Sequence, residues 1–92
     1  MYTQQQVAKA WSQGKPARGS NMHTDGLNVW SYDWHLIGWT DVVKKTKNVY
    51  VCSYSATTRG KHVNNLLKYA DKLHPDDHTN KAGLKLIKEW AS

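Results

Sequence analysis

Four side chains in the stretch YSATTRGKH, residues 54–62, are of types that bind phosphate. They are two hydroxyls and two cations: Thr57, Thr58, Arg59 and Lys61. We expect a helix to begin here, and the first turn of a helix has free amide groups that attract anions. The Gly-Lys pair is not a P-loop, because that motif needs glycine where Ser55 stands and Ser or Thr where His62 stands. We expect a phosphate at this helix start, with His62 beside it; the alternative is an ordinary cap with solvated cations.

Basic side chains alternate with tryptophans elsewhere in the chain. The cations lie in loops expected to be exposed: Arg18, Lys44, Lys45 and Lys47. The rings between them are Trp30, Trp34 and Trp39. Cations interleaved with rings that can stack on bases are typical of surfaces that bind single-stranded nucleic acid. We therefore predict a binding surface of this kind; the alternative is a solvated hairpin tip.

The remaining polar clusters predict neither catalysis nor a metal site. His74 and His78 are four residues apart, but Pro75 places a helix boundary between them and no third ligand stands out. Asp76 and Asp77 are expected to cap the next helix or to lie in its first turn. No serine or cysteine has a positioned base. We expect a protein that is not an enzyme and has no cofactor, metal or small-molecule substrate.

Positive charge is concentrated in the first three quarters of the chain. The 92 residues include 13 Lys and Arg against 7 Asp and Glu, a net charge of +6. Residues 1–70 contain nine basic and three acidic side chains, whereas residues 71–92 contain four of each. This asymmetry favours a polyanionic partner, nucleic acid first and an acidic protein second. The alternative is a charge that serves only solubility.

Cysteine usage and hydropathy predict a soluble intracellular protein. The single cysteine, Cys52, permits no internal disulfide, in agreement with a reducing compartment. No apolar run approaches the roughly 18 residues that span a bilayer. The first residues also lack the apolar core of a signal peptide.

The order of elements predicts one α+β domain over residues 1–92. We expect an N-terminal helix, a three- to four-stranded antiparallel meander and two C-terminal helices, over residues 3–13, 22–54, 57–73 and 79–91. Thr3 and Gln6 have capping-box spacing, and Gly14 provides the stop. Asp25-Gly26 indicates a tight turn inside the sheet.

The two C-terminal helices are expected to cover the sheet. The first has an apolar face formed by Val63, Leu66, Leu67, Ala70 and Leu73, at helical spacing. We expect it to end at His74-Pro75. The second is expected to pack through Leu84, Ile87 and Trp90.

Two segments of the chain together resemble a widespread family of small phage and prophage proteins of unassigned function. The shared residues span about 40 of the 92 positions and are Thr24-Asp25-Gly26, Ser31-Tyr32, Tyr54-Ser55, Thr57-Thr58 and His62. The resemblance implies phage origin and the cytoplasm of an infected bacterial host. Small basic phage proteins without catalytic residues often act stoichiometrically against host defences, and anti-CRISPR inhibitors are the prominent example.

On this basis we expect an anti-CRISPR inhibitor that binds a host CRISPR effector ribonucleoprotein, crRNA together with Cas subunits. Its basic face would contact exposed RNA or acidic protein and block binding of target DNA. A net charge of +6 excludes an acidic DNA mimic. One alternative is a free-standing nucleic-acid-binding accessory protein, which should hold naked single strands of most sequences. Another is a structural or assembly protein whose charge is incidental.

Overall fold

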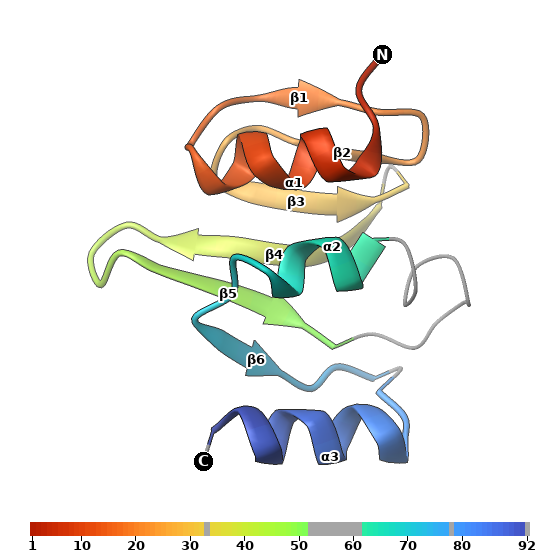
Figure 1. The fold of residues 1–92 in the computed structure, drawn as a ribbon, viewed down its shortest axis with the longest axis vertical. Helices are drawn as coiled ribbons and strands as arrows, with labels where there is room; N and C mark the ends of the chain where they lie inside the picture. The colour runs from red at the N-terminus through yellow and green to blue at the C-terminus, as the bar shows by residue number, and fades with distance from the viewer. Residues whose placement is uncertain (33, 52–61, 78, 92) are drawn as a thin grey trace.

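The computed structural model describes residues 1–32, 34–51, 62–77 and 79–91 (Figure 1). Its elements are α1 (Gln4–Ser12), β1 (Ala17–Arg18), β2 (Met22–Thr24), β3 (Asn28–Ser31), β4 (His35–Asp41), β5 (Thr46–Tyr50), α2 (Asn64–Leu67), β6 (Lys72–His74) and α3 (Lys81–Trp90). The α+β class is confirmed. The sheet has six strands rather than three or four, and less of the chain is helical than expected.

The strands follow one another across the sheet in chain order, from β1 to β6. Neighbours from β1 to β5 are antiparallel, as in the expected meander, whereas β6 runs parallel to β5. A parallel neighbour requires a long crossover, and the chain between β5 and β6 includes α2 (Figure 1). Strands β1 and β6 both lie outside the predicted sheet range 22–54, and the parallel direction of β6 was not predicted.

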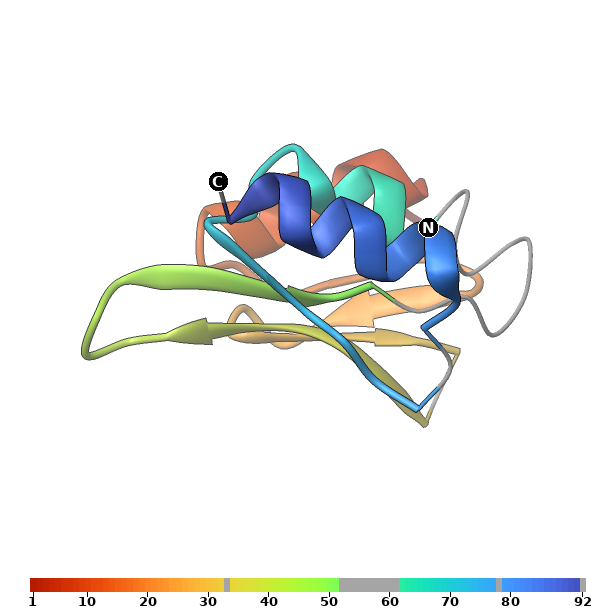
Figure 2. The ribbon, with the colours of Figure 1, turned by 90° about the horizontal axis from the view of Figure 1, so that it is seen from below.

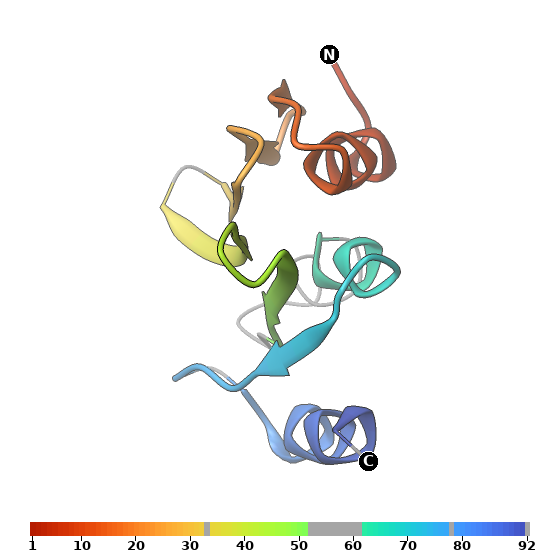
Figure 3. The same ribbon diagram turned by 90° about the vertical axis from the view of Figure 1, so that its left-hand side faces the viewer.

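All the described helices lie on one side of the sheet. Figure 2 shows them above it, and Figure 3 shows them on its right-hand side. Residues of both layers are fully buried between them, among them Val7 and Trp11 of α1, Val29 of β3 and Leu66 of α2. The predicted core position of Leu66 is therefore confirmed. We call this side of the sheet the covered face and the other the free face, since within the described residues no helix lies on it.

Helix α1 begins and ends as expected. Thr3 accepts a hydrogen bond from the Gln6 backbone amide, and the Gln6 side chain accepts one from Thr3 in return. Gly14 follows the helix with φ of +73°. The turn at Gly26, with φ of +103°, joins β2 to β3 as predicted. The Asp25 carboxylate accepts hydrogen bonds from the backbone amides of Asn28 and Leu27, and the bond from Asn28 is the larger cause that lowers the pKa of Asp25.

The prediction of a helix over residues 57–73 is wrong in its second half. Helix α2 ends at Leu67, and Leu73 is buried as part of strand β6. Asp71 explains the change, because its backbone amide donates to the Lys47 carbonyl at 2.7 Å and its carboxylate accepts the Lys47 amide at 2.7 Å. Pairing with β5 therefore prevails over helix propensity, which is a weak local preference. Residues 52–61 lie outside the described part.

Helix α3 is shorter than the predicted range 79–91, and of its three predicted anchors only Ile87 packs against the core. Asn80 caps it, accepting the Gly83 amide at 2.8 Å. Asp76 and Asp77 precede the cap, so their expected place at the cap or in the first turn is wrong. Leu84 and Trp90, two of the three expected anchors, are 51% and 41% exposed. The residues that pack against the core are Leu86 and Ile87.

Candidate nucleic-acid interface

One row of side chains crosses the free face from β1 to β4. His23 pairs with Arg18 on one side and with Trp30 on the other, and Trp30 pairs with Leu36. Residues directly opposite one another in a sheet project to the same face. The chain neighbours of Trp30 are Val29 and Ser31, which are fully buried. Since side chains alternate along a strand, Trp30 and its row point away from the helices.

The rings of His23 and Trp30 are stacked. Their centroids are 4.9 Å apart and their planes differ by 16°. The exposed side chain of Arg18 and the ring of His23 border an open hollow of about 410 Å³. A cation beside a stacked aromatic pair suits the phosphate and the base of one nucleotide.

A second group of rings lies on the same face, over β4, β5 and β6. The Trp39 centroid is 4.8 Å from that of Tyr50 and 5.0 Å from that of His74. The strand register places these residues together, because Trp39 opposes Asn48 and Tyr50 opposes His74. Asn48 is buried beneath the group. Half-exposed aromatic rings on a sheet are the kind of surface on which unstacked bases pack.

His74 is held in this group as a neutral ring. Its Nε2 lies 2.9 Å from Oδ1 of Asn48, an acceptor, so Nε2 carries the hydrogen. Burial is the larger cause that lowers the pKa of His74, and the charge of Lys72 is the second. The ring is therefore uncharged near neutral pH and contributes an aromatic surface instead of a cation.

Trp34 lies at the edge of the free face, in the bend between β3 and β4. Its ring stacks on His35, with centroids 5.0 Å apart, and its side chain is 59% exposed. His35 in turn contacts the Asp76 carboxylate at 3.3 Å. Trp34, Leu36 and Tyr50 border the same hollow of about 340 Å³. The structure thus places the three predicted stacking residues on or beside the free face, as listed: Trp30, Trp34 and Trp39.

The predicted lysine cluster is divided between two environments. Lys44 and Lys45 are exposed at the tip of the β4–β5 hairpin. Lys47 instead lies on the covered face, where its ammonium group donates to the Trp11 carbonyl at 3.2 Å and to Thr40 Oγ1 at 2.7 Å. Burial lowers the pKa of Lys47, and the charge of Asp71 opposes that shift. Lys47 therefore binds the end of α1 and does not add to the exposed charge.

His62 lies in the core, where an external partner has no contact with its ring. It is fully buried, and its Nδ1 lies 2.6 Å from Oγ of Ser31, which is also fully buried. The ring of Tyr32 meets it edge-on at 5.6 Å. The contact between Ser31 and His62 joins the sheet to the start of α2. Four other predicted site residues lie outside the described part: Thr57, Thr58, Arg59 and Lys61.

Sequence patterns did not identify several members of the free face. These are His23, Leu36, Tyr50, Lys72 and His74. The alternation of MHT and NVWS carries a local signal for His23, but Tyr50 and His74 meet only through the parallel pairing of β5 with β6. That pairing depends on residues far apart in the chain.

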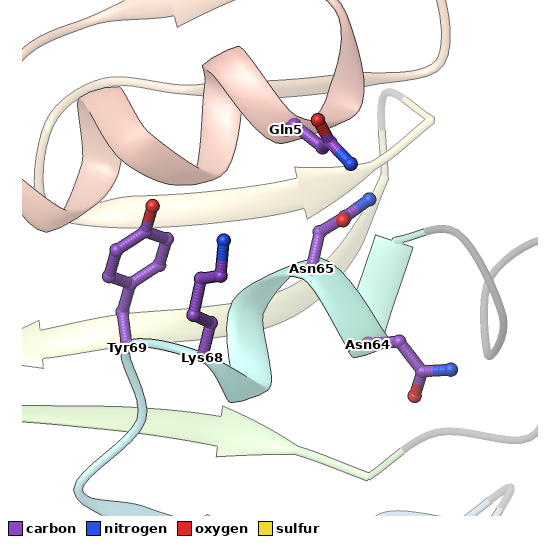
Figure 4. Close-up of a pocket in the computed structure, with 5 residues that line it drawn as sticks. All are labelled: Gln5, Asn64, Asn65, Lys68 and Tyr69. Atoms are coloured by element: carbon purple, nitrogen blue, oxygen red, sulfur yellow. The ribbon is translucent and has the colours of Figure 1, made fainter.

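A polar notch between α1 and α2 is a weaker candidate (Figure 4). Gln5 of α1 and Asn65 of α2 point toward one another there, whereas Asn64 points away. The notch measures about 60 Å³, well below the roughly 300 Å³ at which small-molecule sites begin. A notch of this size has room for a few waters and not for a nucleotide, so the free face is the stronger site.

The site is supported by its geometry, since comparison with known proteins gives no match. No family model, no curated protein and no solved structure matches the chain. Among the described residues, no group of three or more His, Cys, Asp or Glu side chains is placed to hold a metal ion. No helix in that part of the chain is long and apolar enough to cross a membrane.

Proposed function

We propose that the protein binds single-stranded nucleic acid on the free face of its sheet. The observation that carries the proposal is the placement of Trp30, Trp39 and Tyr50 on a sheet surface that no described helix covers. Each base stacked on an aromatic side chain contributes roughly 1–3 kcal/mol. Two ring groups on one face therefore supply enough free energy for binding without a deep pocket.

The charge of the chain supports nucleic acid over an uncharged ligand. Arg18 and Lys72 are exposed at opposite edges of the free face, on β1 and β6. The net charge of +6 attracts a polyanion over a longer range. A ligand that lies across the strands from β1 to β6 would contact one cation at each edge and the rings between them.

A second level of the proposal concerns the partner in the host. We propose an anti-CRISPR inhibitor whose free face contacts RNA of a crRNA-guided complex, in the cytoplasm of an infected bacterium. The β4–β5 hairpin favours a target that includes protein, because Val42 and Val43 are 61% and 88% exposed at its tip. The hairpin extends beyond the helices in Figure 2. A free-standing accessory protein, the alternative, needs no such apolar tip.

The first test measures binding of a labelled ten-nucleotide oligo(rU) by fluorescence anisotropy at several salt concentrations. We expect affinity to fall steeply with salt, because phosphate contacts release counterions. Trp39→Ala should weaken binding about 5- to 150-fold, the equivalent of one stacked base. Leu84→Ala on the exposed side of α3 is the matched control and should bind normally. Affinity that is flat with salt and insensitive to Trp39→Ala would contradict the proposal.

A second test separates the inhibitor from the accessory protein. The inhibitor should bind an assembled crRNA-guided complex more tightly than naked RNA, and replacement of Val42 and Val43 by Ser should remove that difference. The accessory protein should bind both equally. If the protein binds the complex and naked RNA with equal affinity, and the Val42 and Val43 substitutions change neither affinity, the inhibitor proposal is wrong. The proposal of nucleic-acid binding would remain intact.

The helix start predicted at YSATTRGKH gives a third test. We propose that Arg59 and Lys61 bind a phosphate of the same partner. Changing both to Glu should abolish binding and leave folding intact, whereas changing Lys85 and Lys88 on α3 should alter neither. Normal binding by the Arg59 and Lys61 variant would show that these cations are only solvated.

A further inference from the structure

A cleft lies between β6 and α3, at the edge of the sheet. It measures about 380 Å³ and is lined by Asp71, Lys72, Leu73, His74, Ile87, Trp90 and Ala91. Strand β6 is the last strand in the sheet order, so no described strand closes the outer side of the cleft. Its volume falls within the range of roughly 300–1,000 Å³ of small-ligand sites.

His74 belongs both to the ring group on the free face and to the lining of the cleft. Its ring centroid lies 5.0 Å from that of Trp39, and the residue borders the cleft. Lys72 projects to the same side as His74, since the two are separated by one residue in β6. Leu73 between them is buried toward the helices. A ligand that lies on Trp39 therefore reaches the cleft by passing around the edge of β6.

The chemistry of the lining matches a nucleotide. Trp90 is 41% exposed and, with Ile87, provides an apolar wall for a base. Lys72, an exposed cation that borders the cleft, suits a phosphate. The Asp71 carboxylate, the acid in the lining, accepts the Lys47 backbone amide at 2.7 Å, which draws it toward β5.

We infer that this cleft binds a nucleotide at one end of the strand held by the free face, with Trp90 against the base and Lys72 at the phosphate. This inference rests on the proposed function. It adds a subsite, a direction in which the bound strand leaves the sheet, and a minimum length for full affinity. A peptide that adds to the edge of β6 is the competing occupant.

Oligo(rU) of increasing length, from three to ten nucleotides, tests the inference with the full-length protein. Affinity should rise in a step at the length that reaches the cleft. Trp90→Ala should remove that step, weakening the longer oligonucleotides about 5- to 150-fold and the shortest ones less than about twofold. Trp90→Phe, which retains a stacking ring, should restore most of the step. Lys72→Ala should lower the salt slope of the longer oligonucleotides by about 1.

The outcomes separate the subsite from the function on which it rests. If Trp39→Ala weakens all lengths and Trp90→Ala weakens none, the free face binds nucleic acid and the subsite is wrong. If no oligonucleotide binds, both are wrong. Leu84→Ala, on α3 and outside the cleft lining, controls for indirect effects on the helix. If Trp90→Ala lowers the melting temperature, Trp90→Phe is compared with Trp90→Leu instead. Both side chains fill the volume of the ring and only Phe stacks, so the step in affinity should be present in Trp90→Phe and absent in Trp90→Leu.

Discussion

On the covered face of the sheet, Val29, Ile37 and Val49 are fully buried under the helices. On the free face, side chains of the same strands are aromatic rings that pack against one another, such as Trp39 and Tyr50. The covered face follows from burial of apolar area, which is the main source of stability. Rings on the free face add little to that core, and their number there supports the proposed binding of nucleic acid.

Polar groups also differ between the two faces. On the covered face Lys47 and His62 each contact a specific partner inside the protein: the Trp11 carbonyl and the Ser31 hydroxyl. On the free face Arg18 and Lys72 are exposed. Buried polar groups require partners inside the protein, whereas the side chains of exposed cations stay in contact with solvent. The comparison predicts that substitutions on the covered face alter stability and those on the free face alter binding.

The largest expected effect is on the covered face, at Leu66. Leu66→Asp places an unpaired charge in the fully buried position between α2 and the sheet. Since small domains have only about 5–15 kcal/mol of stability, we expect loss of the cooperative thermal transition in circular dichroism. Leu84→Asp, at a position that is 51% exposed, should melt like the wild type. An unchanged melt of Leu66→Asp would show that α2 is not part of the core.

A pair of tryptophans tests the two faces directly. Trp11→Ala removes a fully buried ring and the hydrogen bond from its Nε1 to the Leu27 carbonyl at 2.9 Å, and should cost about 3–5 kcal/mol. Trp39→Ala removes ring contacts on the free face and should cost about 1 kcal/mol. Urea denaturation measures both. Equal losses would mean that Trp39 is a structural residue and would weaken its assignment to the interface.

The turn between β2 and β3 sets the register that separates the two faces. A one-residue slip would exchange the side chains of the two faces. In Gly26→Ala the new methyl group would lie 2.8 Å from the Gly14 carbonyl oxygen at φ of +103°, with a cost of about 3 kcal/mol. Gly14→Ala is the control, because nothing lies within 4 Å of the new group and only the backbone conformation is strained. It should cost about 1–2 kcal/mol. Equal costs would exclude the steric contact as the cause.

Lys47 tests whether a cation on the covered face is structural. Lys47→Ala removes the hydrogen bonds to the Trp11 carbonyl and to Thr40, and should lower stability by about 1–2 kcal/mol. Lys44→Ala at the exposed hairpin tip should change it by less than about 0.5 kcal/mol. In the binding assay the order should reverse, with the larger effect at Lys44. A loss of affinity in a stable Lys47→Ala protein would return Lys47 to the binding surface.

Local features of the sequence predicted local structure correctly, and pairing between distant residues determined the rest. The capping box of Thr3 and the Asp25-Gly26 turn depend on neighbours within a few positions, so composition and spacing were sufficient. Strand β6 depends on the pairing of Lys72 with Asn48, 24 residues earlier in the chain, which no periodicity indicates.

The candidate site divides in the same way. The tryptophans were predicted because they alternate with basic residues along the sequence, and this pattern can be recognised without the structure. Their neighbours on the free face depend on the strand register, including the irregularity at Val29/Trp30 that places Trp30 opposite Leu36 and Trp39 opposite Asn28. Lys47 was misassigned because the run KKTKN does not show that β5 begins at Thr46 and turns its next side chain toward the helices.

The smallest expected effect is the pH dependence that His74 gives the free face. Because burial and the charge of Lys72 lower the pKa of His74, the folded protein binds this proton less readily than the unfolded chain. The contribution of His74 to stability is therefore complete above its ordinary pKa of about 6.5 and is lost as pH falls below that value toward the lowered pKa.

His74→Gln should remove this part of the pH dependence, because glutamine still donates to Asn48 but does not titrate. Lys72→Gln should weaken it, because one of the two causes of the shift is gone. Urea denaturation between pH 7.5 and pH 5 measures the loss of stability. We expect the loss to be largest in the wild type, smaller in Lys72→Gln and smallest in His74→Gln. Parallel curves for wild type and His74→Gln would show that the ring is solvated and that the group around Trp39 is looser than its contacts indicate.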